Sequence, residues 1–214
     1  TMGIISYVRP NVTVFRSILG ISWFWFLGSV FLSQFPTFSK NILGGNEEVS
    51  TLFLVVFSVG VGLGSTFCNR LLKGKISARL VPFACIGMTT ATLLLYFFSL
   101  TVQKTGHLAG VMEFIAEPGS WGIIFSFLML AASFVIFSVP MYALMQSRSS
   151  DEHRARVVAC LNITDSFGMV LSAVFVSMLL MLDISVINIF LIMGVVNLMI
   201  NPVLSRLARD EYGK

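Results

Sequence analysis

Charged residues are scarce in this sequence. It has 14 Lys and Arg and 10 Asp and Glu among 214 residues, whereas a soluble domain of this size has roughly a quarter of its residues charged. The charges stand in short gaps between long apolar runs, hydrophobic residues make up 56% of the chain, and the mean hydropathy is +0.89. This composition excludes a soluble enzyme, a disordered tail and a nucleic-acid-binding domain, and it predicts a membrane protein.

Cysteine and catalytic motifs are also in short supply. Cys68, Cys85 and Cys160 lie beside apolar sequence without C-x-x-C spacing or a nearby His, so we interpret them as buried thiols and expect no metal and no cofactor. The chain has no nucleophile elbow, phosphate-binding loop or metal-binding His pair. His107 and His153 fall in connections on opposite sides of the predicted membrane domain. We therefore expect no catalytic residues and no enzyme.

Six long stretches carry almost no charge. A bilayer core about 30 Å thick is crossed by about 20 helical residues, and a backbone in lipid must satisfy its own hydrogen bonds, so these stretches are predicted helices. We predict an all-α membrane protein with a cytoplasmic linker at 1–16, a six-helix domain at 17–209 and a cytoplasmic tail at 210–214. The predicted spans are 17–38, 51–68, 80–102, 121–145, 157–182 and 184–205.

Basic residues divide unevenly between the two sides of these spans. Twelve lie in the terminal segments and in the second and fourth connections, and two, Lys40 and Lys104, lie in the other connections. Because Lys and Arg are retained on the cytoplasmic side, we expect both termini in the cytoplasm.

The third connection, 103–120, is the longest and has a helical pattern of its own. It is either a short interfacial helix or an ordinary external loop. The apolar residues at helical spacing are Leu108, Val111, Met112, Phe114 and Ile115.

Asp165 is the one acid within the predicted spans. Asn162, Asp165, Ser166 and Met169 follow the i, i+3, i+4, i+7 spacing of one helical face. Counted from residue 157, Asp165 lies about 12 Å into the membrane from the cytoplasmic side. Acids in spans usually face a cavity or a protein interior, so two interpretations stand. Asp165 either binds a proton, a cation or a substrate ammonium group, or is a structural carboxylate held by a neighbouring helix.

Span two is rich in small residues, and span four contains a proline. Ser58, Gly60, Gly62 and Gly64 form overlapping small-xxx-small pairs, which favour close helix packing. Pro140 removes a backbone hydrogen bond and predicts a kink, either as a hinge or as static shape.

Span one is rich in aromatic residues. Trp23 and Trp25 lie too deep for an interfacial belt alone, and they either line a pathway for a lipid-like substrate or face lipid and neighbouring helices. Gln34 is a cavity candidate, because an amide at that depth needs a partner.

The segment after span two resembles the cytoplasmic loop signature of the major facilitator superfamily. Residues 64–75 read GSTFCNRLLKGK, with an Asn where the family has an acid and a longer gap between the Arg and the second Gly. The motif residues are Gly64, Asn69, Arg70, Lys73, Gly74 and Lys75.

Other motifs resemble the carboxyl-terminal half of lysophospholipid transporters, especially the transporter domain of bacterial acyltransferase and acyl-carrier-protein synthetase fusions. These motifs are WFWFLG at 23–28, QFP at 34–36, GGNE at 44–47, VPMYALMQ at 139–146, HRARVVA at 153–159 and NI at 162–163. The resemblance implies spans seven to twelve of a twelve-helix transporter in the bacterial inner membrane. Its substrate would be a lysophospholipid, moved to the cytoplasmic leaflet for reacylation.

This resemblance also implies partners and site residues. A missing amino-terminal six-helix half would form the other wall of the cavity. The aromatic face of span one would hold the lipid tail, and the headgroup would meet polar residues, namely Gln34, Tyr142, Asn162 and Asp165. Trp23 and Ser166 are further cavity candidates. At the cytoplasmic mouth, Arg148, Arg154 and Arg156 either meet anionic lipid headgroups or only set the topology.

Three alternatives remain open. The chain could belong to a proton-coupled exporter of drugs or metabolites in the same superfamily, with Asp165 as the titrating site. It could be a non-transporting module that anchors a fused acyltransferase. A six-span homodimer needs a complete gene starting near Met2, and the first eleven residues instead read as the middle of a longer chain, because they lack a secretory signal.

Overall fold

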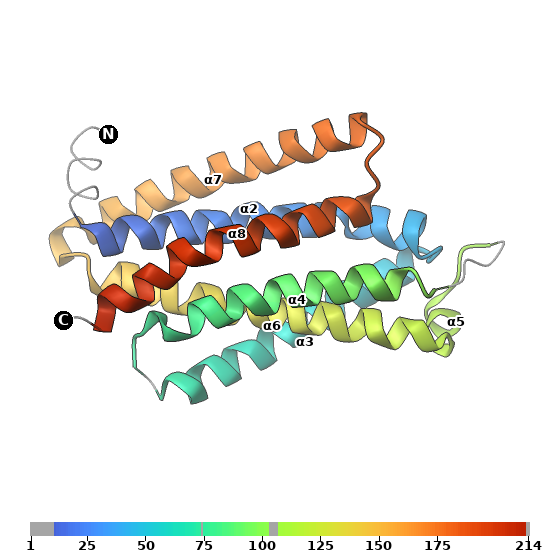
Figure 1. Ribbon diagram of the computed structural model, residues 1–214, viewed down its shortest axis with the longest axis horizontal. Helices are drawn as coiled ribbons and strands as arrows, with labels where there is room; N and C mark the ends of the chain where they lie inside the picture. Colours follow the sequence, from blue (N-terminus) through green and yellow to red (C-terminus); the bar gives the residue numbers. More distant parts are fainter. Residues whose placement is uncertain (1–10, 74, 103–106, 213–214) are drawn as a thin grey trace.

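Six long helices dominate the computed structural model of the protein, which describes residues 11–73, 75–102 and 107–212, the last six without their side chains (Figure 1). Within these ranges the chain is helical and contains no strand, only an isolated bridge between Gly45 and Ala109. The long helices are α2 (Val12–Thr37), α3 (Glu47–Leu72), α4 (Val81–Ser99), α6 (Pro118–Ser147), α7 (Asp151–Met181) and α8 (Val186–Tyr212). The shorter elements are the π-helix η1 (Phe38–Ile42), the 3-10 helix η2 (Ala78–Leu80) and α5 (Val111–Ala116).

All six predicted spans are confirmed as helices long and apolar enough to cross a membrane, so the protein is a multi-pass membrane protein. Most of these helices are longer than the charge-free runs, because a charged residue outside the bilayer can still belong to the helix. The α2 helix begins at Val12, where the Asn11 side chain accepts from Val14 N, so part of the expected 1–16 linker is helical. The α8 helix likewise continues to Tyr212, into the expected tail. The rest of both segments, 1–10 and 213–214, lies outside the described residues.

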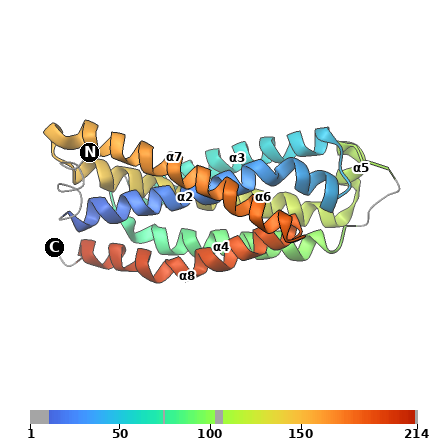
Figure 2. The same ribbon diagram turned by 90° about the horizontal axis from the view of Figure 1, so that it is seen from above.

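Helices that follow one another in sequence are mostly not the closest neighbours in space. The α3 helix packs mainly on α6, and α7 packs mainly on α2. The α4 helix packs on both α6 and α8, and the two views agree that α4 and α8 run side by side (Figures 1 and 2). The first and second groups of three long helices are therefore interlocked, each middle helix lying against the first helix of the other group.

Two glycines bring α3 against α6. A Cβ at Gly60 would lie 2.7 Å from the Leu128 carbonyl oxygen, and a Cβ at Gly64 would lie 2.6 Å from the Ala132 carbonyl oxygen. Both pairs are offset by 68 residues, so α3 and α6 run in the same direction. Gly62, between them, has open space around the same position. The prediction that small residues of span two support close packing is thus confirmed for Gly60 and Gly64.

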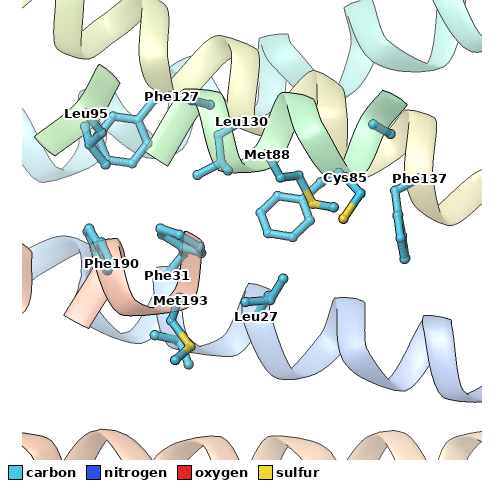
Figure 3. Packing of buried hydrophobic residues seen from close by; sticks show 14 of the residues in the cluster. Leu27, Phe31, Cys85, Met88, Leu95, Phe127, Leu130, Phe137, Phe190 and Met193 are labelled. Atoms are coloured by element: carbon cyan, nitrogen blue, oxygen red, sulfur yellow. The ribbon is translucent and has the colours of Figure 1, made fainter. Parts of the chain in front are cut away.

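The core lies where α2, α4, α6 and α8 meet. The rings of Phe31 and Phe190 lie 4.6 Å apart, and both side chains are buried. Figure 3 shows side chains from all four helices in this region, among them Leu27, Phe31, Met88, Phe127, Leu130, Phe190 and Met193.

The end of the bundle opposite the basic connections is closed by a backbone contact. Asn46 N donates to Ala109 O at 2.9 Å, and Ala109 N donates to Gly44 O at 2.8 Å. The third connection then forms α5, whose Phe114 ring is buried against Phe53 of α3. Of the two readings of this connection, the short helix is correct, and it is anchored on the bundle.

Candidate functional site

Asp165 lies in a polar contact between α2 and α7. The Ser22 hydroxyl donates a 2.6 Å hydrogen bond to an Asp165 carboxylate oxygen. One heptad further along both helices, the Ser29 and Ser172 hydroxyls lie 2.5 Å apart. Both pairs are offset by 143 residues, so α2 and α7 are parallel and in constant register. Gly168 lies between the pairs, and a Cβ there would be 3.4 Å from the Ser22 carbonyl oxygen.

The residues predicted to share a face with Asp165 separate from it. Asp165 is only 7% exposed, whereas Asn162 and Ser166 are exposed and Met169 is 42% exposed. Ser166 and Asn162, at positions i+1 and i−3 from Asp165, both lie on the same side of it around the helix axis. Asp165 is therefore at the edge of the predicted face, next to α2. The carboxylate is held by a hydroxyl of a neighbouring helix, and within the described chain no basic side chain pairs with it.

Tyr142 joins α6 to the same part of α2. The Trp25 indole donates a 2.8 Å hydrogen bond to the Tyr142 hydroxyl, and both residues are half-buried. Ser22 and Trp25 are three residues apart on α2, so their partners Asp165 and Tyr142 reach α2 within about one turn of each other. The structure thus brings together two of the predicted headgroup residues, with Ser22 and Trp25 as their supports.

Trp23 and Gln34 lie apart from this cluster. The Trp23 indole donates to the Asn197 side chain of α8, at 3.1 Å. Gln34 is half-buried, and its amide donates weakly to its neighbour Ser33 at 3.4 Å. Gln34 is also twelve residues, or about 18 Å of helix, beyond Ser22.

Asn197 is a buried polar centre that the sequence analysis did not single out. Its amide nitrogen donates to Cys85 O at 2.8 Å and to the Thr89 hydroxyl at 3.1 Å, and its oxygen accepts from Trp23. It therefore links α8 to α4 and α2. The sequence signal for this residue is an amide side chain in an uncharged span, which is also what marks Gln34.

The loop motif is mostly helical. Gly64, Asn69 and Arg70 belong to α3, which ends at Leu72, so the motif does not begin a loop at residue 69 as the predicted span boundary implied. Lys73 ends the helix in a left-handed conformation with φ of 51°. Gly74 lies outside the described residues.

A cavity of about 540 Å³ brings this motif together with the predicted hinge. It lies between the end of α3, residues 75 and 76 of the connection after it and the last third of α6. Pro140 is buried and lines the cavity, so the prolyl ring faces the motif rather than the Asp165 cluster. The lining residues are Ser65, Thr66, Cys68, Asn69, Arg70, Leu72, Lys75, Ile76, Val139, Pro140 and Ala143.

The three arginines predicted at the mouth are all exposed at this end of the bundle. Arg154 forms a 2.8 Å salt bridge with Asp151, one turn earlier on α7. The Arg148 carbonyl accepts from the Asn11 side chain, which ties the α6–α7 connection to the start of α2. Arg156 lies in the second turn of α7. The Arg154–Asp151 salt bridge is exposed, and exposed ion pairs add little to stability.

The described residues contain no group of three or more His, Cys, Asp or Glu side chains that would hold a metal ion. Comparison of the chain with protein-family models, with curated proteins and with solved structures gives no match.

Proposed function

We propose that this chain is the carboxyl-terminal six-helix half of a major facilitator transporter that moves lysophospholipid across the bacterial inner membrane for reacylation. Both termini would be cytoplasmic. The proposal rests on the motif resemblance and on one structural observation, the unpaired side-chain amide of Asn162 on the exposed surface of α7.

The α7 helix is the least covered of the six. In its most apolar 18-residue window 17% of the residues are buried, against 56% for α6. Its exposed surface includes Asn162, whose side-chain amide makes no hydrogen bond within the described chain. By contrast, the exposed hydroxyls of Ser166 on α7 and of Thr66 on α3 bond back to the carbonyl four residues earlier. An unpaired amide in lipid is costly, so this face of α7 is better suited to a cavity or to another protein domain.

A second six-helix domain supplies such a cover. It would lie over the exposed faces of α3 and α7, with the substrate between the two halves. The Trp25–Tyr142 pair and Asn162 provide polar contacts for a headgroup. Exposed apolar residues, including Leu19, Leu32 and Phe15 of α2, provide a surface for one acyl chain.

The deciding experiment is uptake of labelled lysophosphatidylethanolamine by bacterial spheroplasts that lack their own transporter. They would express the complete parent gene, and a separately supplied acyltransferase would convert incoming substrate to diacyl lipid. We expect saturable uptake. Absence of uptake, with the protein inserted, would refute the lipid-transport proposal and favour the exporter or the non-transporting membrane module. Activity of the isolated six-helix chain in liposomes would refute the half-transporter model.

A further inference from the structure

The cavity beside Pro140 has a charge pattern that transport does not explain. Its lining contains two basic side chains, Arg70 and Lys75, and no acidic one. The sequence has no Asp or Glu between Glu48 and Glu113, nor between Glu117 and Asp151. The acids nearest in sequence, Glu47 and Glu48, stand in the first turn of α3, at the opposite end of that helix from the cavity, and the segments that line the cavity contain no carboxylate.

Neither charge is paired elsewhere in the described chain. Arg70 and Lys75 form no ion pair within residues 11–73, 75–102 and 107–206, and both are exposed. Arg70 lies in the last turn of α3 and Lys75 just beyond it, at the end of a membrane-spanning helix. The end of a membrane-spanning helix is expected to lie at the level of the lipid headgroups, where the phosphates are.

The rest of the lining is divided between polar and apolar side chains. Ser65, Thr66 and Asn69 are exposed on α3, next to the bases. Two apolar lining residues, Ile76 and Val139, are 49% and 45% exposed. The lining therefore offers both donors for an anion and an apolar surface for hydrocarbon.

We propose that this cavity binds a phospholipid by its phosphate group, which Arg70 and Lys75 hold by charge-assisted hydrogen bonds, with the acyl chains running over Ile76 and Val139. Arginine suits this role because its planar guanidinium binds two phosphate oxygens at once. The volume is within the range of small-molecule sites, roughly 300–1,000 Å³. A bound lipid would bridge α3, the following connection and α6 next to the proline. The inference does not depend on transport, since a lipid held here need not cross the membrane.

The test is lipid retention by the purified full chain in detergent, measured by native mass spectrometry during titration with phosphatidylglycerol. We expect the variant Arg70→Gln/Lys75→Gln to bind at least about tenfold more weakly. The matched control is Lys73→Gln/Arg79→Gln, which removes two charges from the same segment but none from the cavity lining. The control should change affinity by less than about threefold. Equal losses in the two variants would overturn the proposal, because they would indicate general attraction to a basic surface.

Two further arms identify the source of the phosphate. Diacylglycerol has the acyl chains without phosphate, and glycerol 3-phosphate has the phosphate without chains. We expect both to bind more weakly than phosphatidylglycerol. If diacylglycerol bound as tightly as phosphatidylglycerol, Arg70 and Lys75 would have no role in binding, and the proposal would be wrong. If glycerol 3-phosphate bound as tightly, the cavity would be a site for a soluble anion and not for a lipid. If the double Gln variant fails to fold, Val139→Trp fills the cavity without altering charge, and unchanged lipid retention by that variant would also overturn the proposal.

Discussion

The hydroxyl of Ser22 and the carboxylate of Asp165 form a 2.6 Å hydrogen bond across two parallel helices, α2 and α7. The carboxylate is almost fully buried, and the hydroxyl is its one hydrogen-bond partner given by the described side chains. Removing the donor to a buried carboxylate costs more folding free energy than removing the donor to a neutral group, because the desolvation of the charge is then no longer offset.

Replacement of Ser22 by Ala should therefore destabilise the protein more than replacement of Ser29 by Ala. We expect a loss of about 1.5–3 kcal/mol for Ser22→Ala and about 0.6 kcal/mol for Ser29→Ala, whose partner is the neutral Ser172. Reversible unfolding in mixed detergent micelles measures both. Equal effects would mean that the carboxylate is solvated in spite of its burial.

Asp165→Asn separates the structural role of this residue from a functional one. The Asn oxygen can still accept from Ser22, so we expect normal insertion and a stability change within about 1 kcal/mol. If the charge serves the substrate or a coupling ion, uptake by the complete protein should fall by at least about tenfold in the spheroplast assay. Wild-type uptake at equal expression would leave Asp165 a purely structural role.

Glycine positions on α3 provide a matched pair for the packing argument. Gly64→Ala places a methyl group 2.6 Å from a backbone oxygen of α6, whereas Gly62→Ala meets open space. We expect Gly64→Ala to cost about 1–3 kcal/mol of stability and Gly62→Ala to be neutral or slightly stabilising in the isolated chain. Thermal unfolding in detergent distinguishes them. If Gly62→Ala destabilises the protein only when the proposed amino-terminal half is also present, that half packs on this face of α3.

Asn197→Ala should be among the more damaging single changes in the core. It leaves the Cys85 carbonyl, the Thr89 hydroxyl and the Trp23 indole without their amide partner, and it creates a void between α4 and α8. We expect a loss of about 2–4 kcal/mol. Asn201→Ala is the control on the same helix, because the Asn201 side-chain oxygen is buried without a partner in the described structure. It should cost clearly less in the same unfolding assay.

Sidedness can be measured with single cysteines in a chain whose three native cysteines are replaced. Lys73→Cys and Lys40→Cys lie at opposite ends of the bundle, in the connections that follow α3 and α2. We expect a membrane-impermeant maleimide to label position 40 in intact spheroplasts, and position 73 only after the membrane is opened. The reverse pattern would contradict cytoplasmic termini.

The spans were predictable because long charge-free runs are a strong and local signal. Which helix packs against which was not predictable. The α6 helix is apolar on nearly every side, so its sequence does not reveal that one side contacts α3 and another α4. The small residues Gly60 and Gly64 indicated a close contact, but the identity of the partner depends on an offset of 68 residues that no local pattern encodes.

The candidate site was predictable only in part, for a similar reason. Asp165 stands out as an acid among apolar residues, but whether it turns inward depends on the rotation of α7 about its own axis. The cavity was not predictable as a unit, because Arg70 and Pro140 are seventy residues apart and only the packing of α3 on α6 brings them together. The role of Asn197 was not predictable, because it depends on the contacts of α8 with α4 and α2, which no local pattern in α8 encodes.

The interlocked order of the helices has a consequence for how the protein is made. The α2 helix finds its parallel partner α7 only after more than a hundred further residues have been synthesised, and α3 must wait for α6. During translation, the glycine surface of α3 and the serines of α2 are thus exposed to lipid or to the insertion machinery. Chains arrested before α6 should be prone to misassembly and degradation, and assembly should accelerate once α6 and α7 have left the ribosome.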